Sequence, residues 1–133
     1  MSFSLDQRLA QDSFALTSWA LSDLRLMNDR RYVWLILVPR RPKLRELFEL
    51  TDEDQKALMT EISRAGRLLQ FLFQPDKINI AALGNIVAQL HVHVIARHID
   101  DFSWPQPVWG RGTSEPYESH ELKTLTHKLR ALV

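Results

Sequence analysis

The chain has no cysteine and no long apolar run. Without cysteine it forms neither disulfides nor thiolate metal sites, which fits a reducing compartment. The longest apolar run, Val33–Val38, is far shorter than the roughly 20 residues that cross a bilayer. Residues 1–11 lack a basic segment followed by an apolar stretch, so we predict no signal peptide. We therefore expect a cytoplasmic protein with no membrane partner.

An excess of charge of either sign is also lacking. The 17 Lys and Arg residues nearly balance the 16 Asp and Glu residues, giving a formal net charge of +1. A dedicated nucleic-acid binder is typically strongly basic, so we expect no nucleic-acid partner. The 133 residues, 45% hydrophobic and 25% charged, match an ordinary globular protein and predict one domain over residues 1–133.

Hydrophobic periodicity predicts an α+β domain with a largely antiparallel sheet and flanking helices. A short helix is expected over residues 4–12, with Ser4 as its N-cap and Gln7 completing a capping box. A longer helix should begin after Thr51, and a third, amphipathic helix should follow Glu118. Strands are predicted over residues 14–18, 24–27, 32–38, 77–83 and 86–96. The nearly all-apolar segment 32–38 is expected at the centre of the sheet.

The last predicted strand carries three hydrogen-bonding side chains at alternate positions, Gln89, His91 and His93. Alternate residues of a strand face the same side, so these three would share one face. Such a row is costly to bury unless it meets polar partners or a ligand. An imidazole with an unperturbed pKa of about 6.5 is largely neutral at neutral pH and can attack phosphorus. His91 is therefore a candidate nucleophile, with a protonated His93 and Gln89 as donors to the phosphate.

The segment Gln89–Ile95 resembles the signature of the histidine triad family, in which three histidines alternate with apolar residues. The resemblance spans about Leu16–Trp109 and includes the earlier strand that ends in Pro39 and a basic residue. It implies a HIT-like fold and a nucleotide hydrolase or transferase acting at the α-phosphate. The middle histidine, here His91, would form a nucleotidyl-histidine intermediate. Expected substrates are purine nucleotide conjugates, such as dinucleoside polyphosphates or nucleoside phosphoramidates.

The same resemblance suggests further roles. Asn85, in the turn before the strand, resembles the polar position that helps to hold the phosphate, and Asn79 is a further candidate for substrate binding. Asn28 and Asp29 resemble the ribose-binding position. The resemblance implies no resident cofactor and no metal site; a divalent cation would enter only with the substrate. Because the family commonly forms homodimers, we expect a homodimer.

Two positions depart from the family pattern. Gln89 replaces the first histidine, and Trp34 stands where many members carry a further histidine. Because an amide cannot carry a proton, a nucleotide-binding module with little turnover remains an alternative. A metal-binding protein is another alternative, since His91 and His93 at alternate strand positions can chelate zinc. The other histidines, which would have to supply a third ligand, lie in separate segments: His98, His120 and His127.

Overall fold

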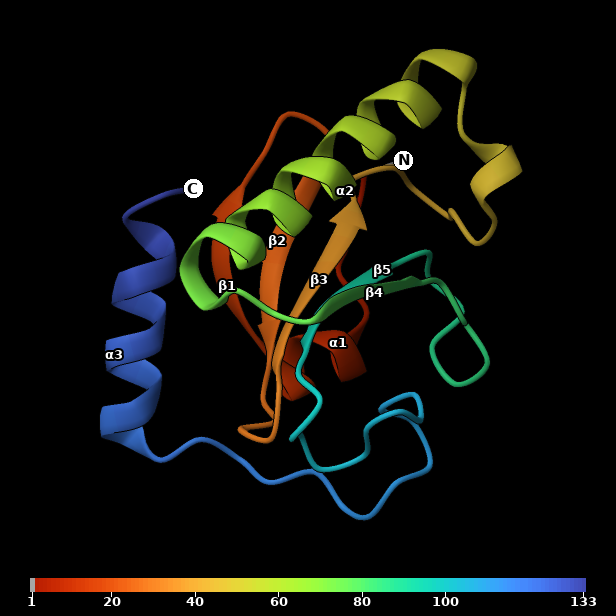
Figure 1. Cartoon of the computed structure of the whole chain (residues 1–133). Coiled ribbons are helices and arrows are strands. Elements are labelled where there is room, and N and C mark those ends of the chain that lie inside the picture. The colour runs from red at the N-terminus through yellow and green to blue at the C-terminus, as the bar shows by residue number, and fades with distance from the viewer. Residues whose placement is uncertain (1) are drawn as a thin grey trace.

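The computed structural model describes residues 2–133 (Figure 1). Its centre is a five-stranded antiparallel sheet in the order β1-β2-β3-β5-β4. The strands are Ser13–Ser18 (β1), Ser22–Met27 (β2), Val33–Pro39 (β3), Lys77–Ala81 (β4) and Val92–Arg97 (β5). The predicted α+β architecture, an antiparallel sheet with flanking helices, is confirmed.

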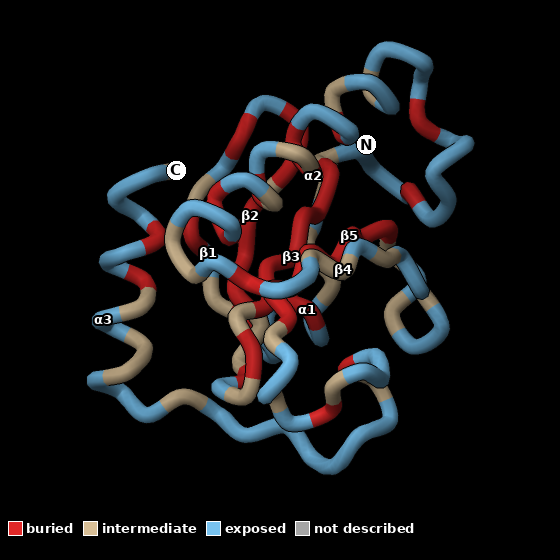
Figure 2. Tube along the Cα trace, in the orientation of Figure 1, coloured by how far each residue is buried: buried red, intermediate tan, exposed pale blue. Residues whose placement is uncertain are grey.

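The middle strand, β3, is buried from Trp34 to Pro39, as its apolar sequence predicted. Alternation divides its side chains between two apolar clusters. Leu35 and Leu37 belong to the larger cluster, which includes the buried face of the longest helix. Trp34 and Ile36 belong to the smaller cluster on the opposite face. The red segments of Figure 2 follow β3 and its neighbours, so the core lies on both sides of this strand.

Helix α2, Asp52–Phe73, crosses one face of the sheet (Figure 1). As predicted, Thr51 is its N-cap, and its Oγ1 accepts a hydrogen bond from the Asp54 amide at 3.1 Å. Its core-facing side chains recur at helical spacing and are buried: Leu58, Ile62, Ala65 and Leu69. This helix covers the face of the sheet opposite the candidate site described below.

The other helices frame the edges of the sheet. A 3-10 turn, η1, spans Leu47–Glu49, and the predicted C-terminal helix is α3, Ser119–Arg130. Helix α1 spans Gln7–Asp12. The predicted N-cap of α1, Ser4, is wrong: the Asp6 carboxylate accepts from the Arg8 amide at 2.8 Å and caps the helix. The Ser4 carbonyl instead accepts a hydrogen bond from the side chain of Gln89.

The prediction of one strand over residues 86–96 is also wrong in its first half. Strand β5 begins only at Val92, and β4 ends at Ala81, so the residues between form an irregular loop. Gly84 has a φ of +75° there, which glycine adopts without the steric cost of a side chain. The amide of Leu90 donates to the carbonyl of Leu44 at 2.9 Å, outside the sheet. His91 therefore lies just before β5, whereas His93 lies on it.

Candidate active site

Two adjoining cavities lie on the face of the sheet opposite α2. The smaller, of about 310 Å³, is lined by both histidines of the motif, by Asn85 and by α1. The larger, of about 520 Å³, is lined by Asn28, Asp29 and the loop around Trp109. The two share four lining residues, so together they form a continuous groove: Arg8, Asp12, Met27 and Trp109. The groove joins the candidate nucleophile to the candidate ribose site.

His91 is held in one orientation by its own backbone. Its Nδ1 lies 2.7 Å from the carbonyl oxygen of Gln89, two residues earlier. A carbonyl oxygen only accepts, so Nδ1 must carry a proton and donate it. The neutral ring then has its lone pair on Nε2, the nitrogen that can attack phosphorus. The His91 side chain is buried and lines the smaller cavity.

His93 has the opposite arrangement. The indole Nε1–H of Trp34 donates to Nδ1 of His93 at 2.9 Å, and an indole nitrogen only donates. Nδ1 of His93 is therefore the acceptor, and the neutral ring carries its proton on Nε2. Burial, with a smaller contribution from neighbouring His91, lowers the pKa of His93 to about 3. The expectation of a protonated His93 is thus wrong: the ring is neutral, with its proton on Nε2.

Gln89 does not lie on β5, and both ends of its amide contact the N-terminal segment. Its Oε1 accepts from the Asp6 amide and its Nε2 donates to the Ser4 carbonyl, each at 2.8 Å. These contacts join residues more than 80 positions apart and fix the segment that leads into α1. One amide hydrogen remains for another acceptor, so the phosphate contact of Gln89 stays a prediction.

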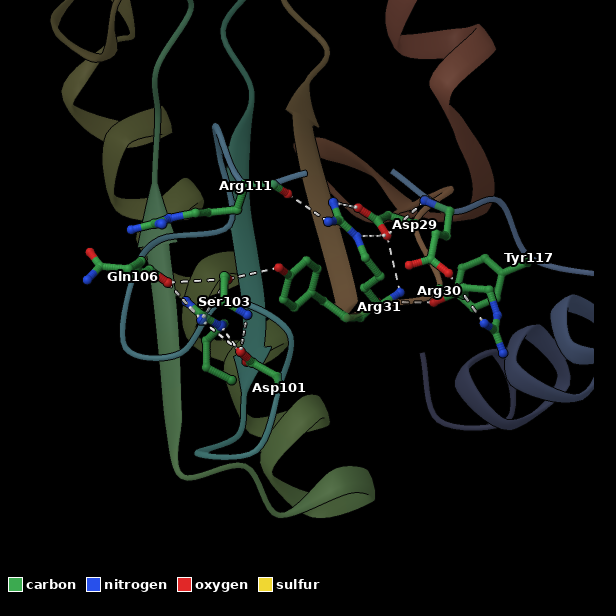
Figure 3. Close-up of polar contacts among 11 residues, drawn as sticks. Asp29, Arg30, Arg31, Asp101, Ser103, Gln106, Arg111 and Tyr117 are labelled. Atoms are coloured by element: carbon green, nitrogen blue, oxygen red, sulfur yellow. Dashed lines mark hydrogen bonds and ion pairs between the residues drawn. The ribbon is translucent and has the colours of Figure 1, made fainter. Parts of the chain in front are cut away.

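The predicted ribose-binding residues line the larger cavity. The Asn28 Oδ1 accepts from the Tyr117 amide at 2.9 Å, so its Nδ2 remains for a ligand. The Asp29 carboxylate is 1% exposed and lies 2.8 Å from Arg31 Nη2 (Figure 3). Asp29 also accepts from the Arg31 backbone amide at 3.1 Å, which ties it into the turn between β2 and β3. Asn28 is therefore the freer of the two to contact a sugar.

Asn79 is placed elsewhere. Its Oδ1 accepts from Arg97 Nη1 at 2.8 Å, and no cavity described above is lined by it. The buried Arg97 guanidinium also pairs with Asp101 at 2.7 Å and donates to the carbonyl of Gln106 at 2.8 Å. Asp101, Ser103 and Gln106, which take part in this network, lie close together in Figure 3. Asn79 thus supports the loop that leads to Trp109, and this contact explains its position without a ligand.

Several groove residues escaped the sequence analysis. Arg8 and Asp12 form an ion pair at 3.6 Å on α1, and both line the two cavities. Trp109 packs edge-on against His93, with ring centroids 4.9 Å apart, and against Trp34 at 5.6 Å. The predicted helix over residues 4–12 contains Arg8 and Asp12. Helical periodicity contains no information on which remote segments meet, so it did not predict that α1 and the loop of Trp109 line one groove.

Within residues 2–133, no group of three or more side chains is arranged to hold a metal ion. None of the helices in the same range is long and apolar enough to cross a membrane.

The class of protein is defined by an α+β domain whose antiparallel sheet places two buried histidines in a groove. The family model of the HIT domain matches residues 8–100, and the chain belongs to the histidine triad (HIT) family. Membership implies nucleotide binding with hydrolase or transferase activity, and proteins of this family typically need no cofactor. None of the curated proteins matches the chain.

Solved structures of bacterial histidine triad proteins are similar over nearly the whole chain. One from Sinorhizobium meliloti is 47% identical, with a TM-score of 0.95, over 98% of this chain and 97% of that one. One from Bradyrhizobium japonicum is 43% identical, with a TM-score of 0.97, over 100% and 99%. One from Marinobacter aquaeolei is 43% identical, with a TM-score of 0.96, over 99% and 96%.

Proposed function

We propose that this protein hydrolyses or transfers nucleoside monophosphoryl groups through a covalent intermediate on His91. The observation that carries the proposal is the bond from His91 Nδ1 to the Gln89 carbonyl, which leaves the Nε2 lone pair as the nucleophile. The groove supplies the rest of a nucleotide site: Asn85 beside the histidines and Asn28 at the far end. We propose purine nucleotide conjugates as substrates.

The reaction takes two displacements at the α-phosphorus. The Nε2 lone pair of His91 forms an N–P bond while the bond from phosphorus to the leaving group breaks, and the leaving atom takes that electron pair. Water, or the hydroxyl of another acceptor, then attacks phosphorus and loses its proton to the solvent, while the N–P bond breaks and its electron pair returns to Nε2 of a neutral imidazole. The Nε2–H of His93 donates to a phosphate oxygen, where charge builds up in both steps. The Gln89 carbonyl stabilises the imidazolium of the intermediate through Nδ1–H.

The test is an incubation with a panel of adenosine and guanosine conjugates, followed by detection of the released nucleoside monophosphate. Quenching in an alkaline denaturant with a substrate labelled at the α-phosphorus should trap label on the protein, at an N–P bond that survives base and is hydrolysed by acid. Release of monophosphate without a trapped adduct, even in rapid-quench samples, would favour direct attack by water and contradict the covalent route.

A nucleotide-binding module with little turnover is the second candidate. It is favoured by one observation: the Gln89 amide cannot give up a proton and the His93 ring is held neutral, so neither is suited to protonate a leaving group. Tight nucleotide binding with no monophosphate released from any conjugate would establish this alternative.

The expected homodimer also becomes a proposal. Strand β4 is an edge strand of the sheet, and Ile80 on it is 53% exposed. Leu83 and Ile86 in the following loop are exposed as well. An apolar patch beside an unpaired strand edge suits a second copy of this chain. We propose that a single HIT domain over residues 1–133 pairs through this edge.

A further inference from the structure

Trp34 lies on β3, and its indole packs against His93 on the neighbouring strand β5. Trp34 and His93 are both buried, at 6% and 4% exposure, and their ring centroids lie 5.5 Å apart. The strand register explains the contact. Trp34 pairs with Ile95 on the neighbouring strand and His93 pairs with Ile36, so the two side chains lie diagonally on one face of the sheet.

We propose that Trp34 is a positioning residue that fixes His93 as the Nε2–H tautomer, so that His93 donates to the bound phosphate and does not act as an acid. The contact from His93 to a phosphate rests on the proposed function, whereas the His93 tautomer can be measured in the free protein. A neutral imidazole carries one ring proton, on either Nδ1 or Nε2. Because the indole N–H of Trp34 donates to Nδ1, the proton of His93 lies on Nε2.

The surroundings of His93 contain no competing partner for Nδ1. Ile36 on β3, Ala81 on β4 and Trp109 from the loop are uncharged neighbours. His91 lies 4.8 Å away, centroid to centroid, but its own Nδ1 already donates to a carbonyl. The remaining charged groups on the cavity are Arg8 and Asp12, which pair with each other on α1.

The pH dependence of the site follows from this arrangement. Protonating Nδ1 of His93 would break its bond to an indole that can only donate, and it would place a cation beside His91. His93 is therefore held neutral near neutral pH. The acid limb of the pH profile of kcat/KM should show no ionisation of His93.

The test combines a direct readout of the tautomer with activity. Long-range ¹H–¹⁵N NMR spectra of the histidine rings are recorded for the free protein, with His93 assigned through His93→Gln. We expect an Nε2–H ring that does not titrate between pH 5 and pH 8. Trp34→Phe removes the N–H and keeps an aromatic ring. We expect it to mix the tautomers, to bring the His93 titration toward neutral pH and to lower kcat/KM about tenfold.

Trp19→Phe is the matched control. Trp19 is as buried as Trp34, but its indole nitrogen has no hydrogen-bond partner within residues 2–133. We expect this variant to keep the His93 tautomer and the activity, even if its Tm falls. If Trp34→Phe does not fold, Trp34→His supplies a ring that both donates and accepts, and the same mixture of tautomers is expected.

Either of two results would overturn the inference. One is a wild-type His93 that carries its proton on Nδ1 or titrates near pH 6.5. The other is a folded Trp34→Phe protein with an unchanged His93 spectrum and unchanged kcat/KM. A wild type with the expected tautomer that turns over no nucleotide would instead refute the proposed function and leave the tautomer assignment in place.

Discussion

His91 and His93 lie 4.8 Å apart, measured between ring centroids, and carry their ring protons on opposite nitrogens. A carbonyl acceptor places the proton of His91 on Nδ1, whereas an indole donor places that of His93 on Nε2. In the proposed mechanism the two neighbouring imidazoles therefore take different roles, His91 as the nucleophile and His93 as a hydrogen-bond donor. The predictions below separate these two roles.

Replacing His91 removes the nucleophile. We expect His91→Asn to lower kcat/KM by about 10⁴-fold or more, as removal of a nucleophile does elsewhere, with little change in Tm. Monophosphate release and covalent labelling should disappear together. His127→Asn, an exposed position on α3, is the control and should behave as the wild type. A folded His91→Asn protein with wild-type turnover would contradict the assignment.

His93 makes folding stability depend on pH. Its pKa falls from 6.5 to about 3 on folding, so between these values the unfolded chain binds the extra proton. The free energy of unfolding should therefore decrease as the pH falls from about 6.5 toward 4, by up to about 1.4 kcal/mol per pH unit. Urea titrations of the wild type and His93→Gln measure this difference. If the free energy of unfolding changes equally with pH in the two proteins, His93 has the same pKa in the folded and unfolded states, which would contradict the prediction.

Gln89 links the start of the chain to the loop of the nucleophile. Gln89→Leu breaks both bonds to residues 4–6, and we expect it to lower kcat/KM by about tenfold or more and to expose the N-terminal segment to protease. Gln89→His keeps a polar side chain of similar length, and kcat/KM should stay within about tenfold of the wild type. Ser4→Ala is the control, because Ser4 contributes only its backbone carbonyl. A Gln89→Leu protein as active and as protease-resistant as the wild type would remove Gln89 from the site.

Asn28 should distinguish ribose from deoxyribose. Asn28 lines the larger cavity and its Oδ1 is already bonded to the Tyr117 amide, which leaves Nδ2 for a ligand. Asn28→Ala should therefore raise KM about tenfold for a ribonucleotide conjugate and leave its 2′-deoxy analogue nearly unchanged. Asp29→Asn should act differently, by lowering Tm through its lost pairing with Arg31. Equal losses on both sugars in Asn28→Ala would place its contact away from the ribose.

The edge of β4 should decide the oligomeric state. Ile80→Lys puts a charge on the exposed edge, and we expect it to convert a dimer to a monomer in sedimentation or light scattering. Phe71→Lys is the matched control, since Phe71 is also exposed but lies on α2. A monomeric wild type, or a dimer unaffected by Ile80→Lys, would refute this interface.

The sequence correctly predicted the elements that are stabilised by residues near one another in the chain. The capping threonine of α2 and the apolar run of β3 act on near neighbours in the chain, and both elements formed as predicted. Residues 86–91 alternate like a strand, yet they form a loop because Gln89 and Leu90 bond to segments remote in sequence. Periodicity contains no information on such partners. The tautomer of His93 escaped prediction for the same reason, since Trp34 meets His93 only through strand pairing.

The anchoring of Gln89 to residues 4–6 has a consequence for the order of folding. The sheet needs none of these residues, so β2, β3 and β5 can pair before the first segment docks. Contacts that close more than 80 positions of chain form slowly and open readily when few interactions hold them. We expect catalytic competence to arise after the bulk of the fold, and to vanish first under mild denaturant, while the core strands still resist hydrogen exchange.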